Sequence, residues 1–432
     1  MRVLILSTTT GYQLRAFNDA AETLGIELAF ATNHCDRLED PWQDQAVPVK
    51  FHEEDRSLNA ILRAARKKPL SGVIAVGDRP VILAARVTEA LGLPGNPPDA
   101  ARASASKLLT REALDRAGLP VPWFFQVPVG TDPREVLGRM EAEGRQFPCV
   151  IKPIAMAGSR GVMRADGPVA LLAAFERLRA LLGRPDVRVQ RDAALGFALI
   201  EGYIPGDEFA LEGVVDRGEL QAFALFDKPD PLEGPFFEET IYVTPSRLAP
   251  AAQGRVIHTV GAACRAIGLR HGPVHAEVRV NDDGVYVLEV AARPIGGLCA
   301  RTLRFVDRGQ VEKKVRIPDL TPLEGVLLRH ATGEPAADYQ REPSAAGVMM
   351  TPVPRRGMFK RVDGLEQARA IAGIDDIVIT AKPDQMLVPL PEGASYPGFI
   401  FARGETARQV EAALREAYRT LSWVVERPVE LL

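Results

Sequence analysis

Cysteine is scarce in this sequence of 432 residues, and long apolar runs are missing. No run approaches the roughly 20 apolar residues that a membrane-spanning helix needs, so no membrane partner is expected. The formal net charge of −3 gives no electrostatic reason to expect nucleic acid as a partner. The cysteines are scattered without a CxxC pair, which argues against a disulfide framework or a structural zinc site: Cys35, Cys149, Cys264 and Cys299. The expected compartment is a reducing cytoplasm.

Familiar catalytic signatures are missing as well. The glycine-rich segment 156–161 matches neither GxxxxGK[ST] nor GxGxxG, which excludes a P-loop or a Rossmann fingerprint there. No Ser-His-Asp or Cys-His signature is recognisable, so the sequence does not indicate catalysis through a nucleophilic side chain.

The composition is that of an ordinary globular protein, with 46% hydrophobic and 25% charged residues. The length predicts two or three folding units. In the first 95 residues, strands alternate with amphipathic helices, which predicts a parallel sheet covered on both faces: strands 2–7, 26–32 and 72–78, and helices 13–24, 57–68 and 80–91. The Pro- and Gly-rich segment 91–100 predicts a domain boundary.

The rest of the chain mixes strands and helices in a different order. Strands dominate from 150 to about 293, with helices at roughly 168–183 and 250–267, which predicts an α+β unit. The last region, about 345–432, combines strands at 347–353 and 376–382 with helices at 365–372 and 406–424.

Two segments of the middle region offer groups that could bind a nucleotide. In VIKPIAMAGSRGV (150–162), a strand presents Lys152 and is followed by a loop whose glycines let backbone N–H groups point at an anion. In FALIEGYIPGDEF (197–209), Glu201 ends an apolar strand and Glu208 opens the next, so a strand end and a carboxylate could read an adenine and a ribose. The alternatives are a hairpin turn with a surface lysine and a β-turn with two solvated acids.

A strand hairpin is predicted at 272–297, where Asn281-Asp282-Asp283-Gly284 forms the turn. Strand periodicity puts His275, Glu277 and Arg279 on one face and Glu289, Ala291 and Arg293 on one face of the second strand. The remaining residues are predicted to face the core: Val274, Ala276, Val278 and Val280, and Leu288, Val290 and Ala292.

The hairpin thereby brings two acids onto one surface. Like charges opposite each other destabilise a sheet, and a cation between Glu277 and Glu289 would offset that cost. Mg²⁺ takes oxygen ligands from one or two carboxylates together with phosphate oxygens. The alternative is a salt-bridged sheet face, with Glu277 paired to Arg279 and Glu289 to Arg293.

Taken in order, these segments resemble the ATP-grasp superfamily. A helix lysine comes first, in SASKLLTREALDRAGLPVP, followed by VIKPIAMAGSRGV, EGYIPGDE, and HAEV with LEVAARPIGG. The resemblance implies an ATP-grasp fold, α/β and α+β in class. It implies a parallel-sheet N-terminal domain at 1–95, an ATP-grasp domain at 96–340 with a lid at about 115–203, and a small α+β domain at 341–432.

The resemblance also implies roles for individual residues. Lys107 and Lys152 would bind ATP phosphates, under a mobile loop 156–161 that includes Ser159 and Gly161. The adenine hinge would be formed by Glu201, Tyr203 and Ile204, and the ribose would be held by Glu208. Glu277 and Glu289 would bind Mg²⁺, with Mn²⁺ as an alternative metal. Arg293 would be the catalytic cation that stabilises the acyl phosphate. One departure stands out, because Ala291 occupies a position where many family members have a metal-binding Asn.

The RPIGGLCARTLRF segment and the C-terminal region look most like the L-amino acid ligase branch. This implies an ATP-dependent carboxylate–amine ligase acting through an acyl phosphate on small-molecule acids and amines, and a homodimer. The long loop 226–240 is expected to help form the substrate pocket, and His275 to be structural rather than the base for the amine. Two alternatives remain open: a biotin-carboxylase-like or purine-biosynthetic enzyme that activates bicarbonate or formate, and a non-catalytic ATP-binding module.

Overall fold

The computed structural model describes residues 1–8, 12–33, 46–307, 320–393 and 395–427. Cys35 lies outside these ranges. The other cysteines are free and buried: Cys149, Cys264 and Cys299. None of the described helices is long and apolar enough to cross a membrane.

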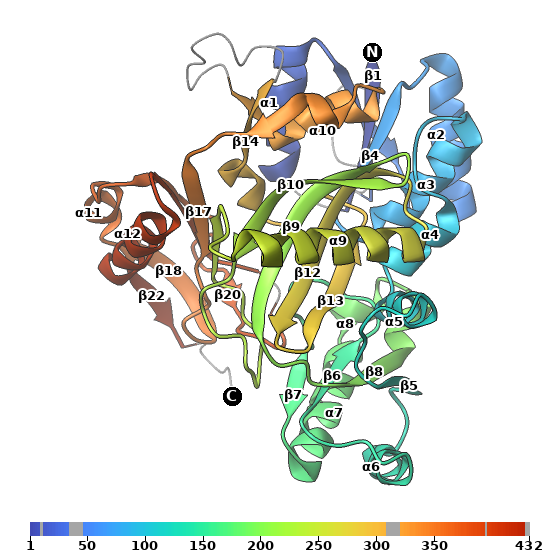
Figure 1. Cartoon of the computed structure of the whole chain (residues 1–432), viewed down its shortest axis with the longest axis vertical. Helices are drawn as coiled ribbons and strands as arrows, with labels where there is room; N and C mark the ends of the chain where they lie inside the picture. The colour runs from blue at the N-terminus through green and yellow to red at the C-terminus, as the bar shows by residue number, and fades with distance from the viewer. Residues whose placement is uncertain (9–11, 34–45, 308–319, 394, 428–432) are drawn as a thin grey trace.

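The N-terminal region forms the predicted parallel sheet, with strand order β3-β2-β1-β4. Its helices pack around this sheet at the top of Figure 1. The strands and helices are β1 (Arg2–Ser7), β2 (Glu27–Thr32), β3 (Ala46–Pro48), β4 (Gly72–Val76), α1 (Tyr12–Leu24), α2 (Glu54–Lys67) and α3 (Pro80–Leu91). The sequence-based prediction of an α/β unit with a parallel sheet is confirmed here.

An eight-stranded antiparallel sheet forms the centre of the molecule, in the order β13-β12-β9-β10-β11-β17-β21-β19. Its strands come from both sides of the boundary predicted at 340/341, and all the predicted domain limits stay predictions. The strands are β9 (Asp207–Asp216), β10 (Glu219–Asp227), β11 (Ile241–Thr244), β12 (His271–Asn281), β13 (Gly284–Ala291), β17 (Ala345–Met350), β19 (Ile374–Ile379) and β21 (Gly398–Gly404).

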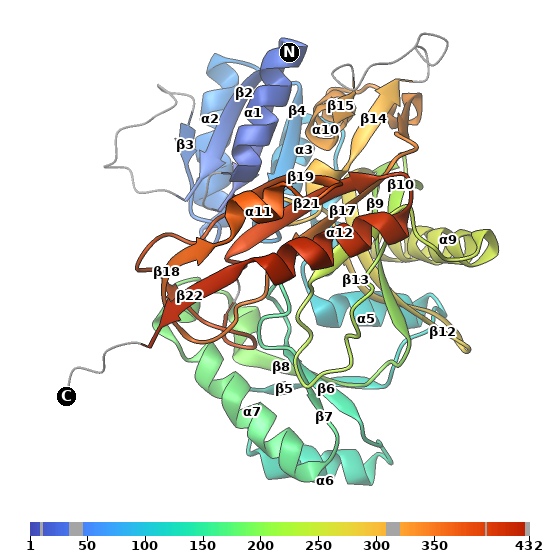
Figure 2. The ribbon, with the colours of Figure 1, turned by 90° about the vertical axis from the view of Figure 1, so that its left-hand side faces the viewer.

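Two helices cover different parts of this sheet. Helix α9 (Pro250–Ile267) contacts β10 and β13, and its residues Val256, Val260 and Cys264 belong to the core beneath it. Helix α12 (Ala407–Thr420) begins at a capping box, in which Thr406 and Gln409 each satisfy the other's backbone N–H. Figure 2 shows α12 lying across β17 and β21.

A smaller antiparallel sheet, β5-β8-β6-β7, lies below the central sheet in Figure 1. Helices α6 and α7 cover it, with Leu171, Phe175 and Leu178 of α7 in its core. Its elements are β5 (Phe124–Pro128), α6 (Pro133–Ala142), β6 (Cys149–Pro153), β7 (Met163–Ala165), α7 (Pro168–Leu182), α8 (Pro185–Arg188) and β8 (Phe197–Gly202). Helices α4 (Pro98–Ser104) and α5 (Lys107–Arg116) lead into it.

The remaining elements form two three-stranded sheets and two helices. They are β14 (Arg304–Asp307), β15 (Thr321–Pro322), α10 (Leu323–Ala331) and β16 (Tyr339–Arg341); then β18 (Gly357–Asp363), α11 (Leu365–Arg369), β20 (Met386–Leu387) and β22 (Ser422–Glu426). The predicted helix 406–424 is too long. Helix α12 ends at Thr420, and the β-branched pair Val424-Val425 belongs to β22, which pairs with β18.

The predicted hairpin forms, but a β-bulge changes one of its faces. Glu277 pairs with Glu289 and Val278 with Val287, so Leu288 is the extra residue between them. Val285, Val287 and Val290 face the core, whereas Leu288 lies at a cavity with Glu289. The prediction that Leu288 faces the core is therefore wrong, because the bulge interrupts the two-residue period.

A close approach between β4 and α10 gives a stability prediction. A Cβ on Gly72 would lie 2.3 Å from the Ala331 carbonyl oxygen. We expect Gly72→Ala to lower the free energy of unfolding by about 1–3 kcal/mol, because backbone on both sides must shift. Gly130→Ala is the matched control, since nothing lies within 4 Å of its added Cβ. Equal unfolding midpoints for the two variants in urea would contradict this contact.

Candidate active site

A cavity of about 450 Å³ is lined by residues of both the small sheet and the central sheet. The structure brings ten of the eleven predicted site residues to its wall: Lys107, Lys152, Ser159, Glu201, Tyr203, Ile204, Glu208, Glu277, Glu289 and Arg293. Lys152 and Glu289, which are 137 positions apart in the sequence, thus face one cleft.

Gly161 is the exception among the predicted residues. It is not among the described residues that line the cavity, and its N–H donates to the Pro391 carbonyl at 2.9 Å. Beside it, Arg160 donates through Nε to the Glu392 carbonyl at 3.0 Å. The glycine-rich loop is therefore anchored to the C-terminal region, and the roles predicted for Gly161 and for a mobile lid stay predictions.

Glu201, on β8, is buried between two cations. Arg111 of α5 donates to it through Nε at 2.9 Å and Nη2 at 3.3 Å, and Lys152 of β6 donates at 2.5 Å. Burial opposes the charge of Glu201, but Arg111 and Lys152 outweigh burial and lower its pKa to about 2. Arg111 also donates to the Val287 and Leu288 carbonyls, so this ion-pair group joins α5 and the small sheet to β13.

The pKa of Lys152 is lowered as well. Burial lowers the pKa of Lys152 to about 8, and Arg111 and Lys107 add to that effect, although Glu201 opposes it. The physical cause is that two cations share one carboxylate. The group of Arg111, Lys152 and Glu201 therefore carries one positive charge in excess beside the cavity.

Lys107, the first residue of α5, extends this positive side. Its ammonium group donates to the Met156 carbonyl at 2.6 Å and lies 3.3 Å from the Glu289 carboxylate. The helix start is fixed by Ser106, whose hydroxyl accepts from the Leu109 N–H at 3.3 Å. Lys107 and Arg111 share one helix face because they are four residues apart.

The opposite wall is a cluster of acids around Lys228, which follows β10. Carboxylate oxygens of Glu208, Glu239 and Glu277 lie within 4.8 Å of one another. The Lys228 ammonium contacts all three, at 2.8 Å from Glu208, in a short contact with Glu239, and at 3.4 Å from Glu277. Burial and the neighbouring Glu277 raise the pKa of Glu239 to about 7.

Arg279 and Arg293 do not form the simple salt bridges with Glu277 and Glu289 that were the alternative prediction. Arg279 binds Glu208 through Nε at 3.0 Å, and Arg293 binds Asp78 at 2.8 and 3.4 Å. Burial disfavours the charge of Arg293, yet Asp78 and Glu289 raise its pKa above the usual value. Asp78 follows β4, so the N-terminal region positions this arginine in the cavity.

Glu212, in the middle of β9, is fully buried and fixes two neighbours. It accepts from the Ile295 N–H at 3.1 Å and contacts His275 Nδ1 at 3.1 Å. His275 Nε2 lies 3.7 Å from Glu277. Burial lowers the pKa of His275, but Glu212 and Glu277 outweigh burial and raise it to about 9, so His275 is an imidazolium at neutral pH.

Comparison with known protein families identifies the domains of the chain. A model of the ATP-grasp domain matches residues 145–302, and a model of the ATP-grasp N-terminal domain matches 18–95. A third model, the L-amino acid ligase C-terminal domain 2, matches 349–426. The chain belongs to the ATP-grasp superfamily. The recognition, the fold class and the identification as an ATP-grasp ligase, all predicted from the sequence, are confirmed.

The relatives of this ATP-grasp ligase include proteins that are themselves named as ligases or synthases. The crystal structure of an L-amino acid ligase from Bacillus licheniformis superimposes with a TM-score of 0.80 at 25% identity, covering 99% of each chain. Carnosine synthase 1 from Gallus gallus is 32% identical over 56% of this chain, but the match spans only 26% of that protein. Alanine–anticapsin ligase from Bacillus subtilis is 24% identical over 56% of this chain and 52% of its own length.

Sequence reasoning missed several residues of this ATP-grasp site. Asp78 gave no local signal, and it meets Arg293 only in the fold. Two others gave a signal that could have been used: Glu212 is an acid inside the apolar run FALEGVV, and Arg111 repeats Lys107 at helical spacing. The loop predicted to form the pocket does contribute Phe237 and Glu239 to the cavity wall.

The buried group around Glu201 predicts a large effect on the stability of this ATP-grasp protein. Arg111 is 1% exposed, and its replacement would leave Glu201 with one cation instead of two. We expect Arg111→Met to lower the free energy of unfolding by about 3 kcal/mol, because the buried Glu201 carboxylate and the Val287 and Leu288 carbonyls lose their arginine donor. Arg116→Met on the exposed end of the same helix is the control, with an expected change within about 0.5 kcal/mol. Similar denaturant midpoints for both variants would show that the pair contributes little.

Proposed function

We propose that this ATP-grasp ligase activates a small carboxylic acid as an acyl phosphate, using ATP and Mg²⁺, and joins it to an amine, both substrates being amino acids or closely related molecules. One observation carries the proposal. Three cations (Lys107, Lys152 and Arg293) and two opposed acids (Glu277 and Glu289) converge on one cavity from elements far apart in the sequence.

The positive side of the cavity suits the phosphates of a nucleotide. Lys107 and Lys152 would contact them, and the excess charge of the Arg111, Lys152 and Glu201 group favours an anion there. Phosphoryl transfer depends on cations in fixed positions more than on a nucleophilic side chain, because the charge spreads over the phosphoryl oxygens. Ser159, in the glycine-rich loop at the cavity edge, would add a hydroxyl to this group.

The small sheet provides a wall suited to an adenine ring. Val150, Leu288 and Tyr203 line the cavity, and the Tyr203 and Phe237 rings stack with centroids 6.5 Å apart. The segment from Glu201 to Ile204 would form the hinge along the base edge. Glu208 would accept from the ribose hydroxyls, with Arg279 and Lys228 fixing the orientation of its carboxylate.

The donor set fits Mg²⁺. Glu277 and Glu289 face each other across the hairpin, and carboxylate oxygens of Glu208 and Glu239 lie within 4.8 Å of Glu277, so the hard oxygen ligands that Mg²⁺ prefers gather here. Ala291, which is buried, offers no ligand atom. Bound Mg²⁺ would neutralise phosphate charge, and Mn²⁺ would satisfy the same oxygen ligands.

The acid and the amine would meet near Arg293. Its guanidinium, held by Asp78, is suited to bind the carboxylate and then the negative charge of the tetrahedral intermediate. Acids face both ring nitrogens of His275, with Glu212 at 3.1 Å from Nδ1 and Glu277 at 3.7 Å from Nε2, which argues against its acting as the base for the amine. His275 would instead orient Glu277.

The C-terminal region argues against the bicarbonate- or formate-activating alternative. The match to the L-amino acid ligase C-terminal domain covers 349–426, and this region contributes Met350, Tyr396 and Phe399 to the cavity wall. A binding module without catalysis would have no use for the opposed acids together with Arg293.

The decisive assay measures ADP and phosphate release from MgATP in the presence of a panel of amino acids. We expect release that requires two amino acids together, with a peptide bond detected by mass spectrometry.

Glu289→Gln should lower kcat at least about 100-fold while leaving the melting temperature unchanged, because a metal ligand is lost. Glu219→Gln, an exposed acid at the edge of β10, is the control with full activity. Release with bicarbonate alone, or tight ATP binding without turnover on any panel, would refute the proposal.

The pKa of Lys152 predicts a pH dependence of nucleotide binding. Lys152 faces Glu201 on β8, and Arg111 and Lys107 on α5. Its pKa of about 8 means that the cation is present below this pH and is lost as the pH rises through it. Affinity for ADP, followed by calorimetry, should fall by up to about tenfold per pH unit above 8. In Lys152→Arg the charge persists, so its profile from pH 7 to 9.5 should be flat; parallel profiles for the two proteins would contradict the assignment.

A further inference from the structure

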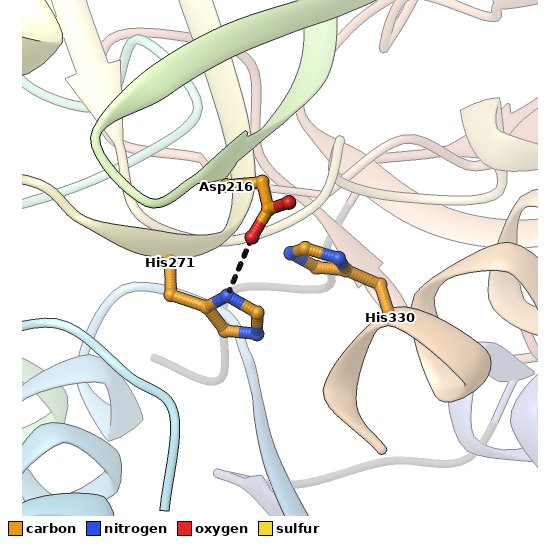
Figure 3. A group of neighbouring side chains, drawn as sticks. All are labelled: Asp216, His271 and His330. Atoms are coloured by element: carbon orange, nitrogen blue, oxygen red, sulfur yellow. Dashed lines mark ion pairs between the residues drawn. The ribbon is translucent and has the colours of Figure 1, made fainter. Parts of the chain in front are cut away.

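A second group of chemically reactive side chains lies away from the cavity, where Asp216, His271 and His330 converge (Figure 3). One carboxylate oxygen and one ring nitrogen from each histidine lie within 4.8 Å of one another. None of the three lines the proposed active site. His271 and His330 also border a separate small cavity of about 40 Å³.

The backbone fixes two of the three residues firmly. Asp216 ends β9 and His271 begins β12, and the two are direct partners across the antiparallel pair. Asn96 accepts from the N–H groups of Arg270 and His271 at 2.7 and 3.1 Å, which anchors the start of β12. His271 Nδ1 lies 3.5 Å from the Asp216 carboxylate.

The third residue comes from a different part of the fold. His330 lies on the last turn of α10 and is 2% exposed. Its ring stacks on that of His271, with centroids 4.0 Å apart and an angle of 21° between planes. Its Nε2 lies 3.3 Å from the Val215 carbonyl oxygen, next to Asp216 in β9. The cluster therefore connects α10 to the central sheet.

Protein groups alone leave this cluster incompletely satisfied. Among the described residues, neither His271 Nε2 nor His330 Nδ1 has a hydrogen-bond partner, although both are buried. A buried polar atom without a partner costs about 1–3 kcal/mol, so such groups usually have a function. The neutral imidazole, rather than the imidazolium, is the form that binds metals.

We propose that Asp216, His271 and His330 form a binding site for one divalent transition-metal ion, with Zn²⁺ as the favoured occupant. Two imidazoles and a carboxylate are a ligand set typical of zinc and its first-row neighbours, and differ from the all-oxygen set proposed for Mg²⁺. A tetrahedral zinc ion holds its ligand atoms about 3.4 Å apart and lies in the plane of each imidazole, so the two stacked rings would turn out of their stack to bind it. The Asp216 side chain is 36% exposed, which leaves room for water as the fourth ligand.

The site would act as a structural clip rather than as a second catalytic centre. The cavity of about 40 Å³ beside the two histidines has no room for an organic substrate. The ion would hold α10 against β9 and β12, and α10 in turn packs against the N-terminal sheet through Ala331 and Gly72.

The test is zinc binding by the full-length protein, in excess Mg²⁺ and without nucleotide, so that sites made only of oxygen ligands are occupied. After equilibrium dialysis against a zinc buffer, we expect about one zinc per chain. Asp216→Asn keeps the shape of a half-exposed side chain and should weaken zinc binding at least tenfold. His330→Gln should have the same effect, and zinc should raise the melting temperature of the wild type but not of either variant.

The control is His258→Ala, because His258 is exposed on α9 and does not belong to the cluster. It should bind zinc as the wild type does. Substitution with Co²⁺ adds a spectroscopic measure, since imidazole ligands give visible absorption that both cluster variants should lose. No zinc on the wild type, or equal zinc affinity in the wild type and Asp216→Asn, would overturn the proposal. Ligase activity is not part of either outcome, so this test is independent of the proposed function.

Discussion

Glu201 lies under two cations, and the geometry of the whole cavity depends on that buried contact. Arg111 reaches it from α5, Lys152 reaches it from β6, and Arg111 continues to the carbonyl groups of the bulge in β13. Four elements, α5, β6, β8 and β13, are thereby fixed relative to one another. A group of this kind is expensive to desolvate, and it persists only where its hydrogen bonds are nearly complete.

The contact also divides the cavity into regions of opposite charge. Two cations share Glu201, which leaves the side of α5 and β6 positive, while Glu208, Glu239 and Glu277 gather around Lys228 on the other side. A nucleotide with its metal matches this separation, because phosphates belong beside the lysines and a hard cation beside the carboxylates. The C-terminal region completes the enclosure, with Tyr396 at the cavity and Pro391 binding the N–H of Gly161.

Much of this could be predicted from the sequence where the signal is local. The alternation of strands and helices located the N-terminal sheet, and the Asn281–Gly284 turn located the hairpin that presents Glu277 and Glu289. The order of motifs identified the superfamily, although each motif alone had an ordinary structural alternative.

The errors and omissions arise where tertiary packing decides. Strand periodicity placed Leu288 in the core, but the bulge turns it to the cavity, and a bulge has no clear signature in one sequence. Helical periodicity continues through Leu421, so the predicted helix extended to 424. In the structure, residues 422–426 instead form a strand, because they pair with β18. Asp78 could not be linked to Arg293 because 215 residues separate them, and no local sequence pattern around either residue indicates the pairing.

The central claim is that one nucleotide lies between the lysine side and the glutamate side of this cavity. The most direct test is a crystal structure with Mg²⁺ and a non-hydrolysable ATP analogue. We predict phosphates in contact with Lys107 and Lys152, the metal on Glu277 and Glu289, and the adenine beside Tyr203. A nucleotide bound elsewhere, or one whose phosphates point away from Lys152 with no metal on either glutamate, would contradict the account.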